Sequence, residues 1–165
     1  MDGLWDERNM RLYESQPNAM LNHEQQKNTA MENGTRLAAV DLGSNSFRLE
    51  IGRIDHGQYY RTEYLKETVR QGSGLDEDRN LTPEAMQRGW ECLARFGERL
   101  AGFNSIEVRA VATQTLREAR NRDEFLVRAN DMLGFPINVI SGLEEARLIY
   151  QGVARALPNG NERRL

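Results

Sequence analysis

A turn near residue 41 carries the residue types that hold phosphate groups. A buried-strand pattern ends at Asp41, and the turn Gly43-Ser44-Asn45-Ser46 follows before the chain becomes apolar again. The backbone N–H groups of such a turn, with the Ser44 or Ser46 hydroxyl, are able to point at phosphate oxygens while Asp41 holds a metal-bound water. An ordinary hairpin is the alternative, because Gly, Ser and Asn are common in turns for conformational reasons. Gly43, Ser44, Asn45 and Ser46 are the phosphate-binding candidates of this turn, and Asp41 is the metal candidate.

Two adjacent acids follow a later strand pattern, and the chemistry of a helix start separates them. Ser141 with Glu144 three residues on matches the capping box, in which both side chains bond to backbone N–H groups of the first helical turn. Glu144 therefore has a structural role, whereas Glu145 has none. Glu145 also follows the carboxyl end of a strand, the edge where open α/β sheets bind ligands. It is the candidate for orienting an attacking water, which suits the loose transition state of phosphoryl transfer.

Arg117 follows the carboxyl end of another predicted strand, in the segment Thr113–Arg117. Its planar guanidinium fork matches phosphate oxygens with two parallel hydrogen bonds. A solvated surface arginine is the alternative interpretation. Arg117 gains weight as a phosphate ligand if the fold brings it to the same edge as Asp41 and Glu145.

Two other metal patterns do not fit. The acids around Asp76 imitate the first ligands of a calcium loop, but Leu81 stands where that loop requires glycine. Neither His23 nor His56 has a Cys or His partner at ligand spacing, so no zinc site is expected.

The first elements needed to position these residues are strands. The apolar run 37–40 predicts a buried strand, and the alternation of Phe47, Leu49 and Ile51 with charged residues predicts a second with one covered face. Tyrosine, threonine and valine in the stretch 58–69 favour a third. We expect these three strands to form an antiparallel meander.

Helices and strands alternate in the rest of the chain. Thr82-Pro83-Glu84 predicts a helix start, and Gly102 its end. A strand over 106–112, a helix capped by Asn121 with Glu124 and running to about residue 132, and a strand over 137–140 follow. Strands separated by helices imply parallel crossovers. The expected fold is an α/β, ribonuclease-H-like lobe with three antiparallel strands followed by two parallel strands with helices.

Composition excludes several classes of protein. The 165 residues are 28% charged, and no apolar run approaches the roughly 20 residues of a membrane span. Residues 1–34 hold six acidic and three basic residues and read as a flexible tail, which leaves the remainder balanced. No global field therefore attracts nucleic acid. With a single cysteine, Cys92, and no secretory signal pattern near Met1, a cytoplasmic location is expected.

Three blocks of this sequence, in this order, resemble the exopolyphosphatase and guanosine-pentaphosphate phosphatase (Ppx/GppA) family. The first block is Ala38-Ala39-Val40-Asp41-Leu42-Gly43-Ser44-Asn45-Ser46-Phe47. The second is Ala112-Thr113-Gln114-Thr115-Leu116-Arg117, and the third is Ile140-Ser141-Gly142-Leu143-Glu144-Glu145-Ala146-Arg147-Leu148-Ile149-Tyr150.

The resemblance implies the actin-like ATPase fold and magnesium-dependent release of the terminal phosphate of polyphosphate or of pppGpp. It also implies that Asp41 belongs to the metal and phosphate site and that Ser44 and Asn45 belong to the phosphate turn. By the same likeness Arg117 binds phosphate and Glu145 serves the catalytic water.

The last residues depart from the family pattern. In the family a stretch like Arg163-Arg164-Leu165 leads into a strand and a second, glycine-rich phosphate loop with another metal-linked Asp, whereas the printed sequence stops at Leu165. We therefore expect residues 35–165 to be the first, incomplete part of the phosphatase domain and to be nearly inactive alone. Glu50, where an aliphatic residue is expected, is a smaller departure.

Exopolyphosphatase activity of the full-length parent is the leading hypothesis, with Mg²⁺ as cofactor. A pppGpp 5'-phosphohydrolase and a non-catalytic, phosphate-sensing actin-like domain are the alternatives, and an actin-like ATPase or sugar kinase is a third. A homodimer of the full-length parent is compatible with the resemblance, but the sequence does not fix the oligomeric state.

Overall fold

The computed structural model describes residues 32–156. The tail predicted for residues 1–34 lies outside the described residues except for its last three, and the segment Arg163–Leu165 lies outside them entirely. None of the helices in the described part of the chain is both long and apolar enough to cross a membrane.

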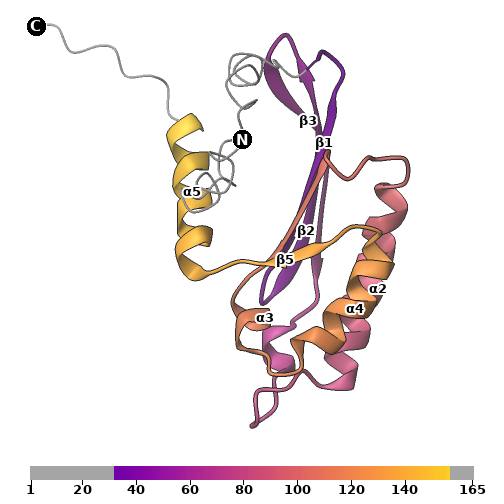
Figure 1. Ribbon diagram of the computed structural model, residues 1–165, viewed down its shortest axis with the longest axis vertical. Helices are drawn as coiled ribbons and strands as arrows, with labels where there is room; N and C mark the ends of the chain where they lie inside the picture. The colour runs from indigo at the N-terminus through magenta and orange to yellow at the C-terminus, as the bar shows by residue number, and fades with distance from the viewer. Residues whose placement is uncertain (1–31, 157–165) are drawn as a thin grey trace, which may run out of the picture. The chain divides into compact units, whose positions relative to one another are not determined.

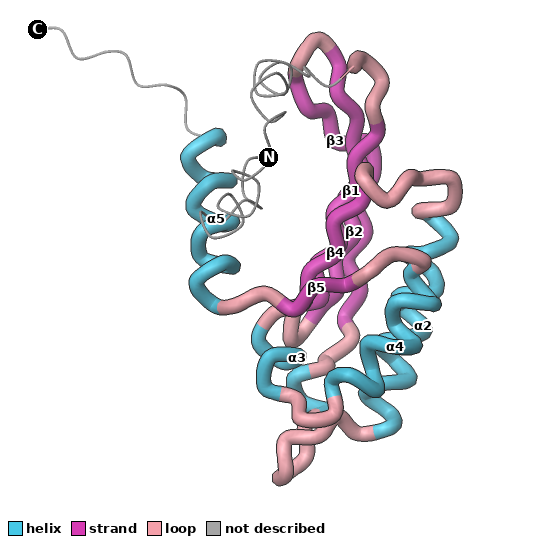
Figure 2. The backbone as a smooth tube through the Cα atoms, viewed as in Figure 1, coloured by secondary structure: helices cyan, strands magenta, loops and turns pink. Residues whose placement is uncertain are grey.

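One five-stranded sheet organises the described residues (Figures 1 and 2). Its order is β3-β2-β1-β4-β5, with β1 in the centre. β2 pairs antiparallel with β1 and β3, whereas β1, β4 and β5 run parallel to one another. The strand bounds are Arg36–Leu42 (β1), Ser46–Asp55 (β2), Gln58–Thr68 (β3), Val108–Ala112 (β4) and Ile137–Val139 (β5).

Helices occupy the connections that the parallel strands require. They are α2 (Pro83–Arg99) between β3 and β4, α3 (Gln114–Glu118) and α4 (Arg122–Leu133) between β4 and β5, and α5 (Gly142–Ala156) after β5. A short 3₁₀ turn, η3 (Gly72–Gly74), follows β3. The predicted element order is confirmed apart from α3 and η3, which the sequence did not predict.

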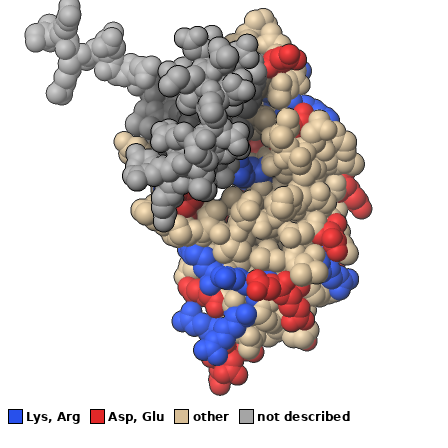
Figure 3. Space-filling view, viewed as in Figure 1, with Lys and Arg blue, Asp and Glu red and all other residues tan. Residues whose placement is uncertain are grey.

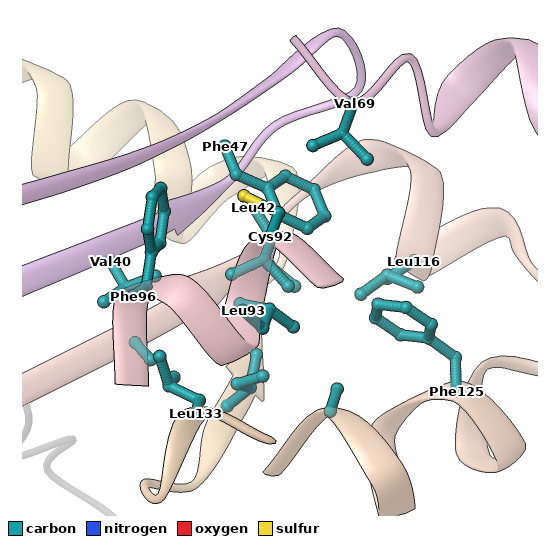
Figure 4. Close-up of a cluster of buried hydrophobic side chains, with 14 of the residues drawn as sticks. Val40, Leu42, Phe47, Val69, Cys92, Leu93, Phe96, Leu116, Phe125 and Leu133 are labelled. Carbon is teal, nitrogen blue, oxygen red and sulfur yellow. The ribbon is translucent and has the colours of Figure 1, made fainter. Parts of the chain in front are cut away.

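The core lies between the sheet and the pair α2 and α4, which pack side by side in Figure 1. Alternate residues of β1 and β2 enter it, including the fully buried Phe47 and Leu49. Phe96 of α2 and Phe125 of α4 are fully buried on the helical side of this core (Figure 4). Alternation of apolar and polar residues in the strands thus gives the sheet a covered face.

Side-chain hydroxyls start two of the helices as predicted, and a glycine ends a third. Thr82 Oγ1 accepts a hydrogen bond from Ala85 N at 3.3 Å and starts α2. Ser141 Oγ accepts one from Glu144 N at 3.1 Å at the start of α5. Gly134 ends α4 at φ +81°, a backbone conformation that favours glycine.

The predicted cap at Asn121 is wrong in its chemistry. Asn121 stands at the N-cap position of α4, but its side chain makes no capping hydrogen bond. Instead, Oδ1 accepts from Leu81 N at 2.8 Å and Nδ2 donates to Leu81 O at 3.0 Å. Leu81 is 2% exposed, so this contact satisfies backbone groups of a buried residue before α2.

The predicted start of the strand over 106–112 is also wrong. β4 begins at Val108, and Ile106 is 90% exposed.

Candidate functional site

The three sequence blocks meet at one edge of the sheet because β1, β4 and β5 are parallel and in register. Leu42 at the end of β1 pairs with Ala112 at the end of β4, and Ala112 pairs with Val139 at the end of β5. The turn after β1, helix α3 after β4 and the start of α5 after β5 therefore leave the sheet from the same edge. This is the edge where open α/β sheets bind ligands.

The turn after β1 is hydrogen-bonded to the segment that follows β3. Gly43 N donates to Ser46 O at 3.2 Å and closes the turn. A Cβ at Gly43 would lie 2.9 Å from Ser46 O, so the tight turn requires glycine. Asn45 O accepts from Val69 N at 3.0 Å and from Arg70 N at 2.9 Å. These bonds fix the carbonyl side of the turn to the neighbouring chain.

The two serines of the turn have different surroundings. Ser46 is 3% exposed, and its Oγ accepts from Asn45 Nδ2 at 3.4 Å. Ser44 is half-buried, and its hydroxyl faces α3, where Thr115 Oγ1 lies 2.9 Å from Ser44 Oγ. The Ser44 hydroxyl is thus the more accessible of the two. The phosphate-binding roles of both serines stay predictions.

Asp41 lies opposite Arg48 in the antiparallel β1–β2 pair. Arg48 Nη1 donates to Asp41 Oδ2 at 2.9 Å, and the two side chains are 44% and 39% exposed. Sequence reasoning missed Arg48, although the alternation of β2 places it on the face away from Phe47 and Leu49. Its position beside Asp41 depends on the strand register, which a single sequence does not display.

The donor set at Asp41 fits a magnesium ion. Mg²⁺ is usually held by one or two carboxylates together with substrate phosphates and water rather than by a protein cage. Asp41 supplies one exposed carboxylate beside the turn. Within residues 32–156 no group of three or more His, Cys, Asp or Glu side chains is placed to hold a metal ion, so the magnesium role of Asp41 stays a prediction.

Arg117 and Glu145, predicted from separate blocks, are in direct contact. Arg117 Nη1 donates to Ile140 O at 2.9 Å and to Glu145 Oε2 at 3.0 Å. Their side chains are 27% and 35% exposed, so the pair is partly shielded from water. Ile140 N in turn donates to Ala112 O at 3.0 Å, which extends the sheet pairing beyond β5. The fold therefore brings the predicted phosphate ligand to the predicted water-orienting acid.

Glu144 lies beside Glu145 in sequence but differs from it in contacts. Its backbone N–H is held by Ser141, and its carboxylate lies 3.7 Å from Arg147 Nε one turn along α5. No hydrogen bond or ion pair joins Asp41 to Glu145 among the residues that the structure describes. The side-chain contacts at this edge thus form three separate pairs, which are Asp41 with Arg48, Arg117 with Glu145, and Ser44 with Thr115.

One hollow in the surface includes Arg117 but not the other residues of these three pairs. An open depression of about 450 Å³ lies beside β5 and is lined by Arg117, Arg122, Asp123 and Ser141 among others. Neither Ser44 nor Glu145 lines it. On the face drawn in Figure 3, basic and acidic side chains are interspersed rather than gathered in one basic patch. Anion binding by this face would therefore be local to a few residues.

The strand order and the parallel crossovers define a mixed α/β lobe of the actin-like ATPase fold. Residues 51–164 match the model of the Ppx/GppA phosphatase family. The chain belongs to the Ppx/GppA phosphatase family.

Solved structures support the same assignment. A PPX-GPPA enzyme of Aquifex aeolicus is 31% identical over 76% of this chain and 42% of its own, with a TM-score of 0.70. An exopolyphosphatase of Cytophaga hutchinsonii is 30% identical over 74% of this chain and 39% of its own, with a TM-score of 0.69. An exopolyphosphatase-like protein is 31% identical over 71% of this chain and 36% of its own, with a TM-score of 0.64. The chain thus spans about two fifths of the length of these relatives.

Proposed function

We propose that this lobe serves an exopolyphosphatase-type phosphohydrolase, which releases the terminal phosphate of polyphosphate. The observation that carries the proposal is the contact between Arg117 and Glu145 at 3.0 Å, on the sheet edge from which the Asp41 turn also leaves. The guanidinium proposed to bind phosphate and the carboxylate proposed to orient water are thereby held together near the glycine-containing turn. The proposal also draws on the family match and on the relative described as an exopolyphosphatase.

Each residue of the edge has a role in this proposal. The turn Gly43–Ser46 receives the terminal phosphates through backbone N–H groups and the Ser44 hydroxyl. Asp41 and the phosphate oxygens would hold Mg²⁺, which when bound neutralises charge that develops on the phosphate. Arg48 pairs with Asp41 Oδ2 and would compete with a cation for this oxygen.

Arg117 has nitrogens left for a phosphate. Nη1 of Arg117 donates both hydrogen bonds, to Ile140 O and to Glu145 Oε2. Nε and Nη2 have no hydrogen-bond partner among the described residues. The free nitrogens are suited to bind phosphate oxygens while Nη1 keeps Glu145 in place. Glu145 would then orient a water molecule for in-line attack on the terminal phosphorus.

The test compares two neighbouring glutamates. Phosphate release from polyphosphate with Mg²⁺ is measured for the 165-residue chain and, where its coding region continues past Leu165, for the longer product. We expect Glu145→Gln to lower kcat by about 100-fold or more, as loss of a group that positions a proton or water does. Glu144→Gln is the matched control and should stay within about threefold of the parent, because within residues 32–156 the one ion pair of the Glu144 carboxylate is with Arg147. Full activity of the Glu145 variant would refute the role of Glu145.

A pppGpp 5'-phosphohydrolase is the second candidate, because the matched family covers both activities by its name. Both substrates present a terminal phosphoanhydride to the same turn. Comparison of kcat/KM for polyphosphate and for pppGpp, with the same protein and the same Mg²⁺ concentration, decides between them. Binding of either ligand without turnover by the longer product would instead support a phosphate-sensing domain.

A further inference from the structure

Thr115 belongs to the helix that contacts both the phosphate turn Gly43–Ser46 and Glu145. It belongs to α3 and is 4% exposed, and its Oγ1 lies 2.9 Å from Ser44 Oγ. Arg117, two residues further on, contacts Glu145. Residues two positions apart on a helix do not share a face. The short helix α3 therefore contacts the phosphate turn with one side and the water-orienting acid with the other.

The contact between Thr115 and Ser44 is closely packed. Gly72 N donates to Ser44 O at 2.8 Å, so the segment after β3 holds the backbone of Ser44 from a second direction. A Cβ at Gly72 would lie 3.2 Å from Ser44 Cβ and 3.3 Å from Thr115 Oγ1. A side chain at position 72 would press on both hydroxyl-bearing residues. Ser44 is thus fixed through its backbone by Gly72 and through its side chain by Thr115.

The hydrogen bond between Thr115 and Ser44 affects how the Ser44 hydroxyl can bind an anion. A hydroxyl has one O–H donor and two acceptor lone pairs, whereas a phosphate oxygen at neutral pH mainly accepts. When Thr115 donates to Ser44 Oγ, it occupies an acceptor site and leaves the Ser44 O–H free to donate outward. The donated bond also polarises the Ser44 hydroxyl and strengthens it as a donor. Without the Thr115 hydroxyl, the Ser44 side chain loses both its orientation and this polarisation.

We propose that Thr115 is a positioning residue, which aims the Ser44 hydroxyl at a terminal phosphate oxygen and links the phosphate turn to the segment that carries Arg117. This inference rests on the proposed function of the turn. It assigns no bond breaking to Thr115, which acts only through Ser44.

The first test measures binding of inorganic tripolyphosphate with Mg²⁺ to the 165-residue chain by calorimetry. Thr115→Val keeps the shape of the side chain and removes the hydroxyl, and it should weaken binding about fivefold, the effect of one hydrogen bond. Thr115→Ser keeps the hydroxyl and should stay within about twofold. Thr62→Val is the control, since Thr62 Oγ1 donates to Ile51 O at 3.2 Å within the β2–β3 pair, and it should leave binding unchanged.

A double-mutant cycle separates positioning from general structural support. In a Ser44→Ala background, Thr115→Val should cause no further loss of tripolyphosphate binding, because its effect passes through the Ser44 hydroxyl. Equal losses in the two backgrounds, or parental binding by the Thr115→Val single variant, would overturn the proposal.

Amide hydrogen exchange tests the link between Thr115 and the turn without any ligand. Thr115→Val should speed exchange of the Gly72 N–H, which is bonded to Ser44 O, while Thr115→Ser leaves it unchanged. Unchanged exchange in Thr115→Val overturns the link between Thr115 and the turn. If the parent chain binds no tripolyphosphate, the proposed phosphate site fails, and faster exchange would then still support the link alone.

Discussion

Arg117 makes its two recorded side-chain hydrogen bonds through one nitrogen, at 2.9 Å to Ile140 O and 3.0 Å to Glu145 Oε2. This arrangement anchors α3 to the start of α5. Because lysine carries a compact charge without a planar fork, Arg117→Lys is not a conservative change at this position. The pair therefore has a structural consequence that is measurable without any substrate.

The prediction for this pair concerns coupling in stability. Arg117→Gln and Glu145→Gln should each lower the free energy of unfolding, and the double variant should lose less than the sum of the two. We expect a coupling energy of about 0.5–1 kcal/mol, since the side chains are partly exposed and screened by solvent. Urea unfolding of the four proteins gives this number. Strict additivity of the two single changes would show that the contact contributes nothing.

Glu67 of β3 and Arg95 of α2 link the edge of the sheet to the long helix. Arg95 Nε donates to Glu67 Oε1 at 3.0 Å. The hydrogen bond from Arg95 holds the pKa of Glu67 below its usual value, and partial burial opposes this effect. A carboxyl whose pKa is lowered by folding stabilises the fold above its unfolded pKa of about 4.3 and loses that contribution as the pH falls through the folded value.

We therefore expect Glu67→Gln to lower the free energy of unfolding at pH 7 by up to about 1 kcal/mol, a modest value because the pair is largely exposed. The difference from the parent should shrink as the pH is lowered to about 3, below the unfolded pKa. Chemical denaturation at the two pH values measures it. Glu63→Gln, which removes the 3.5 Å ion pair with Arg99 on the same two elements, is the control and should change stability by less than about 0.5 kcal/mol. A Glu67→Gln effect that is equally large at pH 3 would contradict the ionic explanation.

Opening of the folded chain can be measured through the reactivity of its single cysteine, Cys92. Cys92 is a residue of α2 within the hydrophobic core and has no exposed surface. Burial, and after it the nearby Glu67 carboxylate, raises the pKa of Cys92 to about 12. A thiol with a raised pKa and no access to solvent reacts with disulfide reagents only when the protein opens.

Labelling of Cys92 at pH 8 should thus be slow in buffer and should accelerate with urea. If the proposed site is real, tripolyphosphate with Mg²⁺ at 100 times its dissociation constant should slow labelling up to about 100-fold, because the ligand stabilises only the folded chain. Fast labelling that does not respond to urea would show that the core around Cys92 opens locally instead.

The sequence alone determined the order of the main elements and the identity of three candidate segments. Local chemistry sufficed there, because an apolar run marks β1 and alternation marks β2, and Thr82 and Ser141 accept from the backbone within three residues of their own positions. The capping box is confirmed only in its first half, since Ser141 Oγ accepts from Glu144 N while the Glu144 carboxylate lies beside Arg147. The water-orienting role of Glu145 stays a prediction. The family assignment also followed from short, ordered blocks of sequence and was confirmed by the family match.

Only the tertiary structure decided which side chains meet. Asn121 forms its bonds with Leu81, 40 residues away, because packing of α4 near the start of α2 offers it buried backbone groups that compete with its own helix end. Arg48 beside Asp41 follows from the antiparallel register, and Thr115 beside Ser44 spans 71 residues. The helix α3 that places Thr115 is five residues long, too short for a periodic pattern to reveal. The sequence therefore supplied the chemical groups, and parallel pairing of β1, β4 and β5 brought their segments to one edge.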